Sequence, residues 1–94
     1  MDIERLRAKI DAVDRRIVRL LNQRARLAMS VGEAKRENGA PIFAPEREEQ
    51  IVREVEACTA KDGAISPESM RAIYSEIISA CRSAERRLAV MISE

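Results

Sequence analysis

Histidine and tryptophan are absent from this 94-residue sequence, and phenylalanine and tyrosine occur only once each. Without histidine, the commonest general base is missing, and so are the nucleophile pairs in which histidine activates serine or cysteine. Any catalysis must then depend on Arg, Lys, Glu and backbone groups. The chain has no aromatic platforms on which bases could stack, and its net charge of only +1 gives no general basic surface. We therefore expect no nucleic-acid partner.

The two cysteines, Cys58 and Cys81, are isolated from each other in the sequence. Because histidine is also missing, a zinc site is not expected, and we predict two free, buried thiols. No apolar run approaches the ~20 residues of a membrane span, and the N-terminus lacks the apolar core of a secretion signal. The sequence therefore predicts a cytoplasmic protein with no membrane partner, folded as a single domain over residues 1–94.

Apolar residues recur at alternating spacings of three and four between residues 2 and 37. These positions are Ile3, Leu6, Ile10, Val13, Ile17, Leu20, Leu27 and Val31. The spacing predicts one α-helix with a single apolar stripe. At ~1.5 Å of rise per residue this helix would be roughly 50 Å long, whereas a compact domain of this size has a radius of gyration of about 12 Å. Its own chain cannot wrap such a helix, so we expect an intertwined oligomer.

Two further helices are predicted after a stop at Asn38-Gly39, a typical helix C-terminus. Pro45 suits the first position of a helix that continues to about residue 59, and residues 61–64 form a polar turn. Ser66 then caps a third helix that begins at Pro67 and continues to about residue 92. Residues 1–37 have a net charge of +4 and the remainder −3, which favours packing of the first helix against the others. The predicted fold class is all-α, with a long, a short and a long helix.

Two cations occupy positions where the stripe of the first helix predicts an apolar side chain. Arg24 falls between Leu20 and Leu27, and Lys35 follows Val31 by four residues. An ion left unpaired in a packed interface costs several kcal/mol, so these cations call for acidic partners or an anionic ligand. The alternative is that both stems lie along the stripe while the charged ends reach water.

Two glutamates interrupt the apolar faces of the later helices. Glu85 lies four residues after Cys81 and three before Leu88, where burial would favour the protonated carboxyl and make it a candidate proton donor. Glu48 shares a face with Ile51 near the start of the second helix. The alternatives are an ion pair between Glu85 and an arginine of the first helix, and a role for Glu48 in stabilising the helix dipole.

Arg7 lies about 25 Å along the first helix from Arg24, so the two side chains cannot meet on one chain. In an antiparallel pair of long helices, however, Arg7 of one copy can approach the middle of the other. Inward cations with two carboxyls in an aliphatic interface would suit a small dianion that also has a neutral polar group.

Four strings of residues together resemble a known family. They are LRAKIDAVDRRIVRLLNQR at residues 6–24, VGEAK at 31–35, PIFAPERE at 41–48 and IISACRSAE at 77–85. In this order and at these separations, the chain resembles the all-helical chorismate mutase family over nearly its whole length. The last string is most similar to mutase domains that precede a prephenate dehydratase.

The resemblance implies a homodimer of three-helix chains with two active sites, each completed by the partner subunit. It implies an isomerase that converts chorismate to prephenate, without a cofactor, in phenylalanine and tyrosine biosynthesis. A separate or fused enzyme of the same pathway is then an expected partner.

The resemblance also implies roles for individual residues, with Arg24, Lys35 and Glu85 as the catalytic ones. Arg24 and Arg7 of the partner subunit would bind the two carboxylates of chorismate. Lys35 would contact a carboxylate and the ether oxygen, and Glu85 would donate a hydrogen bond to that oxygen. Glutamine is often found at the position of Glu85, and glutamate can donate there only when protonated.

Four more residues would bind the substrate. Glu48 would accept a hydrogen bond from the ring hydroxyl, and Arg47 would support the carboxylate side. Ala44 replaces an aspartate of the best-known bacterial pattern but keeps the backbone N–H used there. Cys81 replaces a serine that can contact a carboxylate.

Two other functions compete with the mutase. Isochorismate pyruvate lyases share the fold and can have an Ala-Pro-Glu-Arg connector like that of residues 44–47. A non-catalytic helical dimer could instead serve as a regulatory or assembly module. Such a module would have no reason to keep Arg24, Lys35, Glu48 and Glu85 on apolar faces, so their convergence on one pocket discriminates against it.

Overall fold

The computed structural model describes residues 2–41 and 44–93, except for the side chains of residues 60–62. Over this range the chain forms three helices and no strand: α1 (Ile3–Glu37), α2 (Pro45–Asp62) and α3 (Pro67–Ser93). The predicted all-α class, with long, short and long helices, is confirmed. Ile42 and Phe43 of the predicted connector lie outside the described residues. Within the described part, no helix combines the length and apolar character needed to cross a membrane.

The ends of α1 follow from its capping residues. Asp2 lies just before the helix, and its carboxylate accepts a hydrogen bond from the backbone N–H of Glu4 at 2.9 Å. This bond satisfies one of the N–H groups that a helix leaves unpaired at its start. The helix ends at Glu37, with Asn38 as its C-cap, and Gly39 follows with φ +68°, a conformation that glycine adopts without strain. Both ends agree with the prediction to within a residue.

The second helix is longer than predicted. α2 continues to Asp62, and Gly63 ends it in the left-handed conformation, with its N–H donating to the carbonyl of Thr59. The predicted polar turn over residues 61–64 was therefore wrong in its first half, because nothing before Gly63 stops the helix. The start of α3 was predicted correctly, since the Ser66 hydroxyl accepts a hydrogen bond from the N–H of Ser69 at 3.1 Å.

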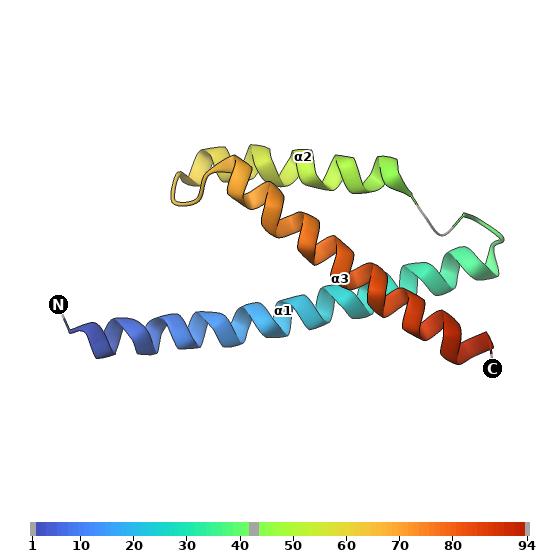
Figure 1. Ribbon diagram of the computed structural model, residues 1–94, viewed down its shortest axis with the longest axis horizontal. Helices are drawn as coiled ribbons and strands as arrows, with labels where there is room; N and C mark the ends of the chain where they lie inside the picture. The colour runs from blue at the N-terminus through green and yellow to red at the C-terminus, as the bar shows by residue number, and fades with distance from the viewer. Residues whose placement is uncertain (1, 42–43, 94) are drawn as a thin grey trace.

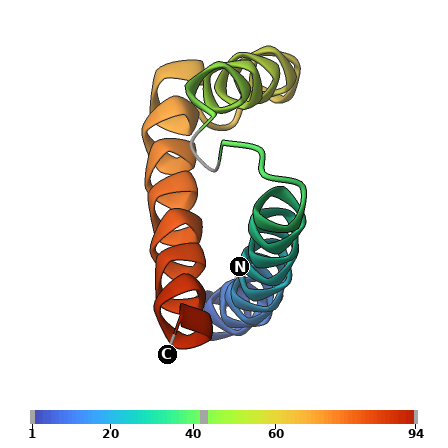
Figure 2. The same cartoon turned by 90° about the vertical axis from the view of Figure 1, so that its right-hand side faces the viewer.

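α3 joins the other two helices. It packs against both α1 and α2, whereas no described Cα atoms of α1 and α2 come within 8 Å of each other. Figure 1 shows α3 crossing the second half of α1, and Figure 2 shows α3 along one side with α1 and α2 at its two ends. The chain is therefore an open frame rather than a closed bundle.

Charge pairs hold α2 to α3. Arg71 on α3 donates hydrogen bonds to Glu56 and, at 3.3 Å, to Glu49, both on α2. These bonds raise the pKa of Arg71 above its usual value, and the bond to Glu56 has the largest effect. All ion pairs found among the described residues lie within α2 or between α2 and α3. Ion pairs of described residues thus connect α2 with α3, and the contacts of α1 with α3 include the hydrogen bond from Arg24 to Cys81.

The single chain has a very small core. Val52, Ile78 and Cys81 are its buried hydrophobic residues, and no large described side chain is completely buried. The radius of gyration is 16.5 Å, compared with about 12 Å for a compact domain of this length. Cys58 is free, as predicted, but exposed rather than buried.

The apolar stripe of α1 is largely uncovered. Ile3, Ile10 and Leu27 are each about 60% exposed, at 63%, 59% and 61% respectively. Figure 1 shows the N-terminal part of α1 projecting beyond both other helices. Contiguous exposed apolar surface of this kind is typical of an interaction site. The chain's own helices thus leave most of the stripe uncovered, and the oligomer stays a prediction.

We predict that Ile17→Ala destabilises the protein far more than the exposure of Ile17 in one chain suggests. Ile17 is 47% exposed, so truncation would cost a monomer less than about 1 kcal/mol. If a second chain buries the side chain, the cost rises to about 2 kcal/mol or more per chain. Urea unfolding at two protein concentrations measures this, since dissociation makes the stability of a dimer depend on concentration.

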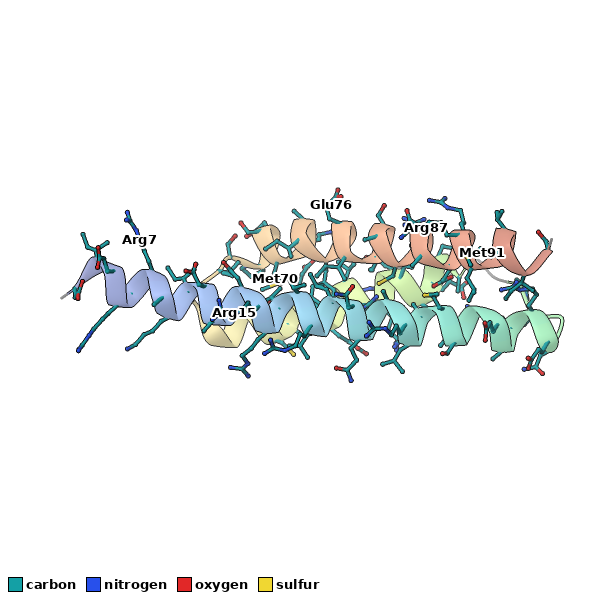
Figure 3. The ribbon with its side chains drawn as sticks, turned by 90° about the horizontal axis from the view of Figure 1, so that it is seen from below. Arg7, Arg15, Met70, Glu76, Arg87 and Met91 are labelled. Atoms are coloured by element: carbon teal, nitrogen blue, oxygen red, sulfur yellow. The ribbon has the colours of Figure 1, made fainter. Side chains whose placement is uncertain are left out.

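Arg15→Ala is the matched control. Arg15 projects from α1 (Figure 3), is exposed and lies off the apolar stripe, so its removal should change the unfolding free energy by no more than about 0.5 kcal/mol. Equal effects of the two substitutions, together with unfolding that does not depend on concentration, would contradict the interpretation of the stripe as an interface.

Candidate active site

A cavity of about 530 Å³ lies between the second half of α1, the first turns of α2 and the second half of α3. This volume is typical of a small-molecule site. Aliphatic residues, including Leu27, Val31, Ile51 and Ile78, form part of its wall. Eight charged side chains also line it: Arg24, Lys35, Arg36, Arg47, Glu48, Arg82, Glu85 and Arg86. Six cations and two carboxylates in a partly apolar cavity favour an anionic ligand with more than one negative group.

Arg24 is directed from α1 toward α3. Its side chain is partly buried, and its guanidinium donates a hydrogen bond to the Cys81 thiol sulfur at 3.1 Å. The guanidinium carbon also lies 6.0 Å from the centre of the Tyr74 ring, within reach of a cation–π contact. Of the two alternatives left open by the sequence, Arg24 follows the inward one, because these contacts direct its charged end across the interface.

Lys35 lines the same cavity as Arg24, eleven residues further along α1. The two positions share the stripe because eleven residues complete slightly more than three full helical turns. Lys35 is partly buried. Two cations on one apolar face thus border one space, which suits an anionic ligand.

Glu48 and Arg82 form an ion pair across the α2–α3 interface. Glu48 is in the first turn of α2, and its carboxylate lies 3.5 Å from the Nε atom of Arg82 on α3. Arg82 was not predicted as a site residue, although it borders the cavity. Glu48 therefore does more than stabilise the helix dipole, since a cation of the neighbouring helix holds its carboxylate at the cavity wall.

Glu85 lies directly against the backbone of α1. A Cβ atom at Gly32, which is buried, would be 3.7 Å from both Cγ and Oε2 of Glu85. Among the described residues Glu85 makes no ion pair with an arginine of α1, so the structural alternative raised by the sequence is not realised. Its carboxyl is partly buried in the cavity wall, which leaves it able to contact a ligand.

The remaining predicted residues on α2 and α3 also border the cavity. Ala44 precedes α2, and its carbonyl accepts hydrogen bonds from the N–H groups of Arg47 and Glu48. Arg47 is exposed and donates to the Gln50 side chain at 2.9 Å. Cys81 is buried on α3 at the cavity wall. Its thiol sulfur accepts the hydrogen bond from Arg24.

Arg7 is the one predicted site residue that the chain does not bring to the cavity. It is exposed near the start of α1 (Figure 3), far along the helix from the part that α3 covers. The sequence predicted this separation, because Arg7 was expected to enter the site of a second copy. One chain therefore presents seven of the eight predicted site residues in one place, and their roles stay predictions.

Three cavity arginines were missed by the sequence reasoning. Each of them comes directly after a residue on the apolar face of its helix. Arg36 follows Lys35, Arg82 follows Cys81, and Arg86 follows Glu85. The available signal was the length of the arginine side chain, which reaches around a helix from a position about 100° off its inner face. Among the described side chains, no three Cys, Asp or Glu residues are grouped as they would be around a metal ion.

Comparisons with known proteins agree with the geometry. Residues 6–86 match the family model described as chorismate mutase type II. The chain is 41% identical over 91 residues to the bifunctional chorismate mutase/prephenate dehydratase of Aquifex aeolicus. The aligned region covers 95% of this chain and 25% of the relative. It is also 46% identical over 46 residues to a chorismate mutase of Methanocaldococcus jannaschii, covering 49% of this chain and 46% of that one.

A solved structure resembles the whole fold. Chorismate mutase form II from Thermus thermophilus superposes with a TM-score of 0.84 and 35% sequence identity, covering 90% of this chain and 94% of that chain. By contrast, the chain spans only about a quarter of the length of the bifunctional relatives. The similarity therefore concerns only part of those longer proteins.

Proposed function

Because this chain belongs to the chorismate mutase type II family, we propose that it converts chorismate to prephenate. The observation that supports this most is that Arg24, Lys35, Glu48 and Glu85, from three helices, border one cavity. A purely structural dimerisation module gives no reason for four charged side chains on apolar faces to converge. The reaction is an intramolecular [3,3] rearrangement, so it requires no nucleophile, metal or cofactor, which suits a chain without histidine.

The protein would act first by orienting its substrate. Chorismate must adopt a chair-like conformer in which the two carbons that will bond lie close together, and fixed cations can hold its two carboxylates in that arrangement. Arg24 lies in the cavity for one carboxylate, with Arg47 at its edge. Glu48, held by Arg82, would accept the hydrogen bond of the ring hydroxyl and so fix the other side of the ring.

The second contribution would be electrostatic. As the C–O bond breaks, negative charge grows on the ether oxygen, and donors already in place there stabilise the transition state more than the substrate. Lys35 on α1 and the carboxyl of Glu85 on α3 border the cavity from different helices. We assign these two side chains to the ether oxygen.

Completion of the site would require a second subunit. We propose a homodimer in which the exposed stripes of two α1 helices cover each other and Arg7 of the partner subunit supplies the second carboxylate contact. The prephenate dehydratase parts of the bifunctional relatives point to an enzyme of phenylalanine and tyrosine biosynthesis as a fused or separate partner. The cytoplasmic location stays a prediction of the sequence.

We predict that Lys35→Ala lowers turnover about a hundredfold or more, because one preorganised donor to a developing oxyanion contributes roughly 3 to 4 kcal/mol. Steady-state kinetics with chorismate measures the loss, and circular dichroism checks that the helices remain. Arg26→Ala, on the exposed face of α1 and outside the cavity, is the control and should retain wild-type turnover. A Lys35→Ala enzyme within a few-fold of wild type would refute the assigned role.

Two substitutions of Glu85 test its role as a hydrogen-bond donor. Glutamine keeps a donor on a side chain of the same length, so Glu85→Gln should retain most of the turnover. Glu85→Ala should lower turnover about a hundredfold, because it removes one preorganised donor. Steady-state kinetics with chorismate measures both variants, and equal turnover of the two would contradict the proposal that Glu85 is the donor.

Product identification separates the mutase from its rival. The connector Ala44-Pro45-Glu46-Arg47 keeps isochorismate pyruvate lyase as the second candidate on this fold. Purified protein is incubated separately with chorismate and with isochorismate. Prephenate from chorismate supports the proposal, whereas salicylate and pyruvate from isochorismate, with chorismate left intact, would assign the lyase activity instead.

A further inference from the structure

Gly32 is an unexplained glycine in the middle of a long helix. It is one of the buried residues of α1, and glycine is less favourable than alanine in a helix interior. Its backbone does not require glycine, since the positive φ angles of the described chain belong to Gly39 and Gly63. A reason for the missing side chain must come from its surroundings.

Helix packing does not require the glycine either. A Cβ atom built at Gly32 would meet Cγ and Oε2 of Glu85 at 3.7 Å and Cδ at 3.9 Å. These are ordinary van der Waals separations, and the carboxyl belongs to a flexible side chain. Alanine would therefore fit into the protein without a ligand, and it would favour the helix.

The position of Gly32 in the cavity supplies a reason. Gly32 lines the cavity together with Lys35, one helical turn further along α1, and with Glu85 across on α3. If Lys35 and Glu85 both donate to the ether oxygen, that oxygen must lie within about 3 Å of each donor. The bridge of the substrate then passes close to the backbone of α1 between them, where a methyl group would protrude.

We propose that Gly32 is a specificity-determining residue, whose missing side chain keeps open the space in which the ether bridge of the substrate lies between Lys35 and Glu85. This inference rests on the proposed function. It places the breaking bond next to the backbone of α1 at Gly32. Glycine at this position makes the helix less stable than alanine would, and the lost stability is the cost of admitting the ligand.

Gly32→Ala tests the proposal because stability and activity should change in opposite directions. The melting temperature should stay the same or rise, as helix propensity predicts. The value of kcat/KM for chorismate should fall by about tenfold or more, since small displacements of reacting groups are costly in rate. Affinity for a bicyclic ether dicarboxylate that mimics the chair-like conformer, measured by calorimetry, should fall to a similar extent.

Ala34→Gly is the matched control. Ala34 is two residues further along α1, exposed and outside the cavity, so the reverse exchange should lower the melting temperature and leave kcat/KM unchanged. The pair separates the effect of glycine on the helix from its effect on the cavity.

Three other outcomes would overturn the inference. A Gly32→Ala protein that is more stable and fully active would show that the space is not used by the substrate. Loss of stability and activity together would assign Gly32 to helix packing. Wild-type protein that neither turns over chorismate nor binds the dicarboxylate would instead refute the proposed function, and this inference with it, so the two failures are distinguishable.

Discussion

The high cost of leaving a charged side chain unpaired among apolar ones is the constraint on which this site depends. Arg24 and Lys35 occupy the apolar stripe of α1, and Glu48 and Glu85 occupy the inner faces of α2 and α3. All four border one cavity. The structure offsets part of the cost through contacts such as the Arg24–Cys81 hydrogen bond and the Glu48–Arg82 ion pair. In the proposed function, a bound dianion would add to this compensation.

The limited burial within one chain also explains its open shape. α1 is too long for two shorter helices to cover, and its stripe stays exposed over most of its length. α3 connects the parts, since it packs on both α1 and α2 while those two remain apart. The cavity lies where α1 and α2 are kept apart by α3. The separation of α1 from α2 therefore leaves room for a ligand.

Periodicity in the sequence predicted which face of each helix is turned inward, and this was sufficient to find Arg24, Lys35, Glu48 and Glu85. It could not find Arg36, Arg82 or Arg86, because these residues lie beside the stripe and reach the cavity through their long side chains. Periodicity also does not specify neighbours between helices. The charge difference predicted attraction of α1 to the later helices, whereas the observed ion pairs connect α2 with α3. The roles implied by family resemblance remain predictions.

Complementation between two inactive variants tests most directly whether each active site is built from two chains. Arg7→Ala and Lys35→Ala are purified separately, unfolded and refolded together in equal amounts. If the partner subunit supplies Arg7, half of the dimers are mixed and each has one intact site, so turnover should recover to about a quarter of the wild-type value. Turnover no higher than that of the separate variants would contradict a site shared between subunits.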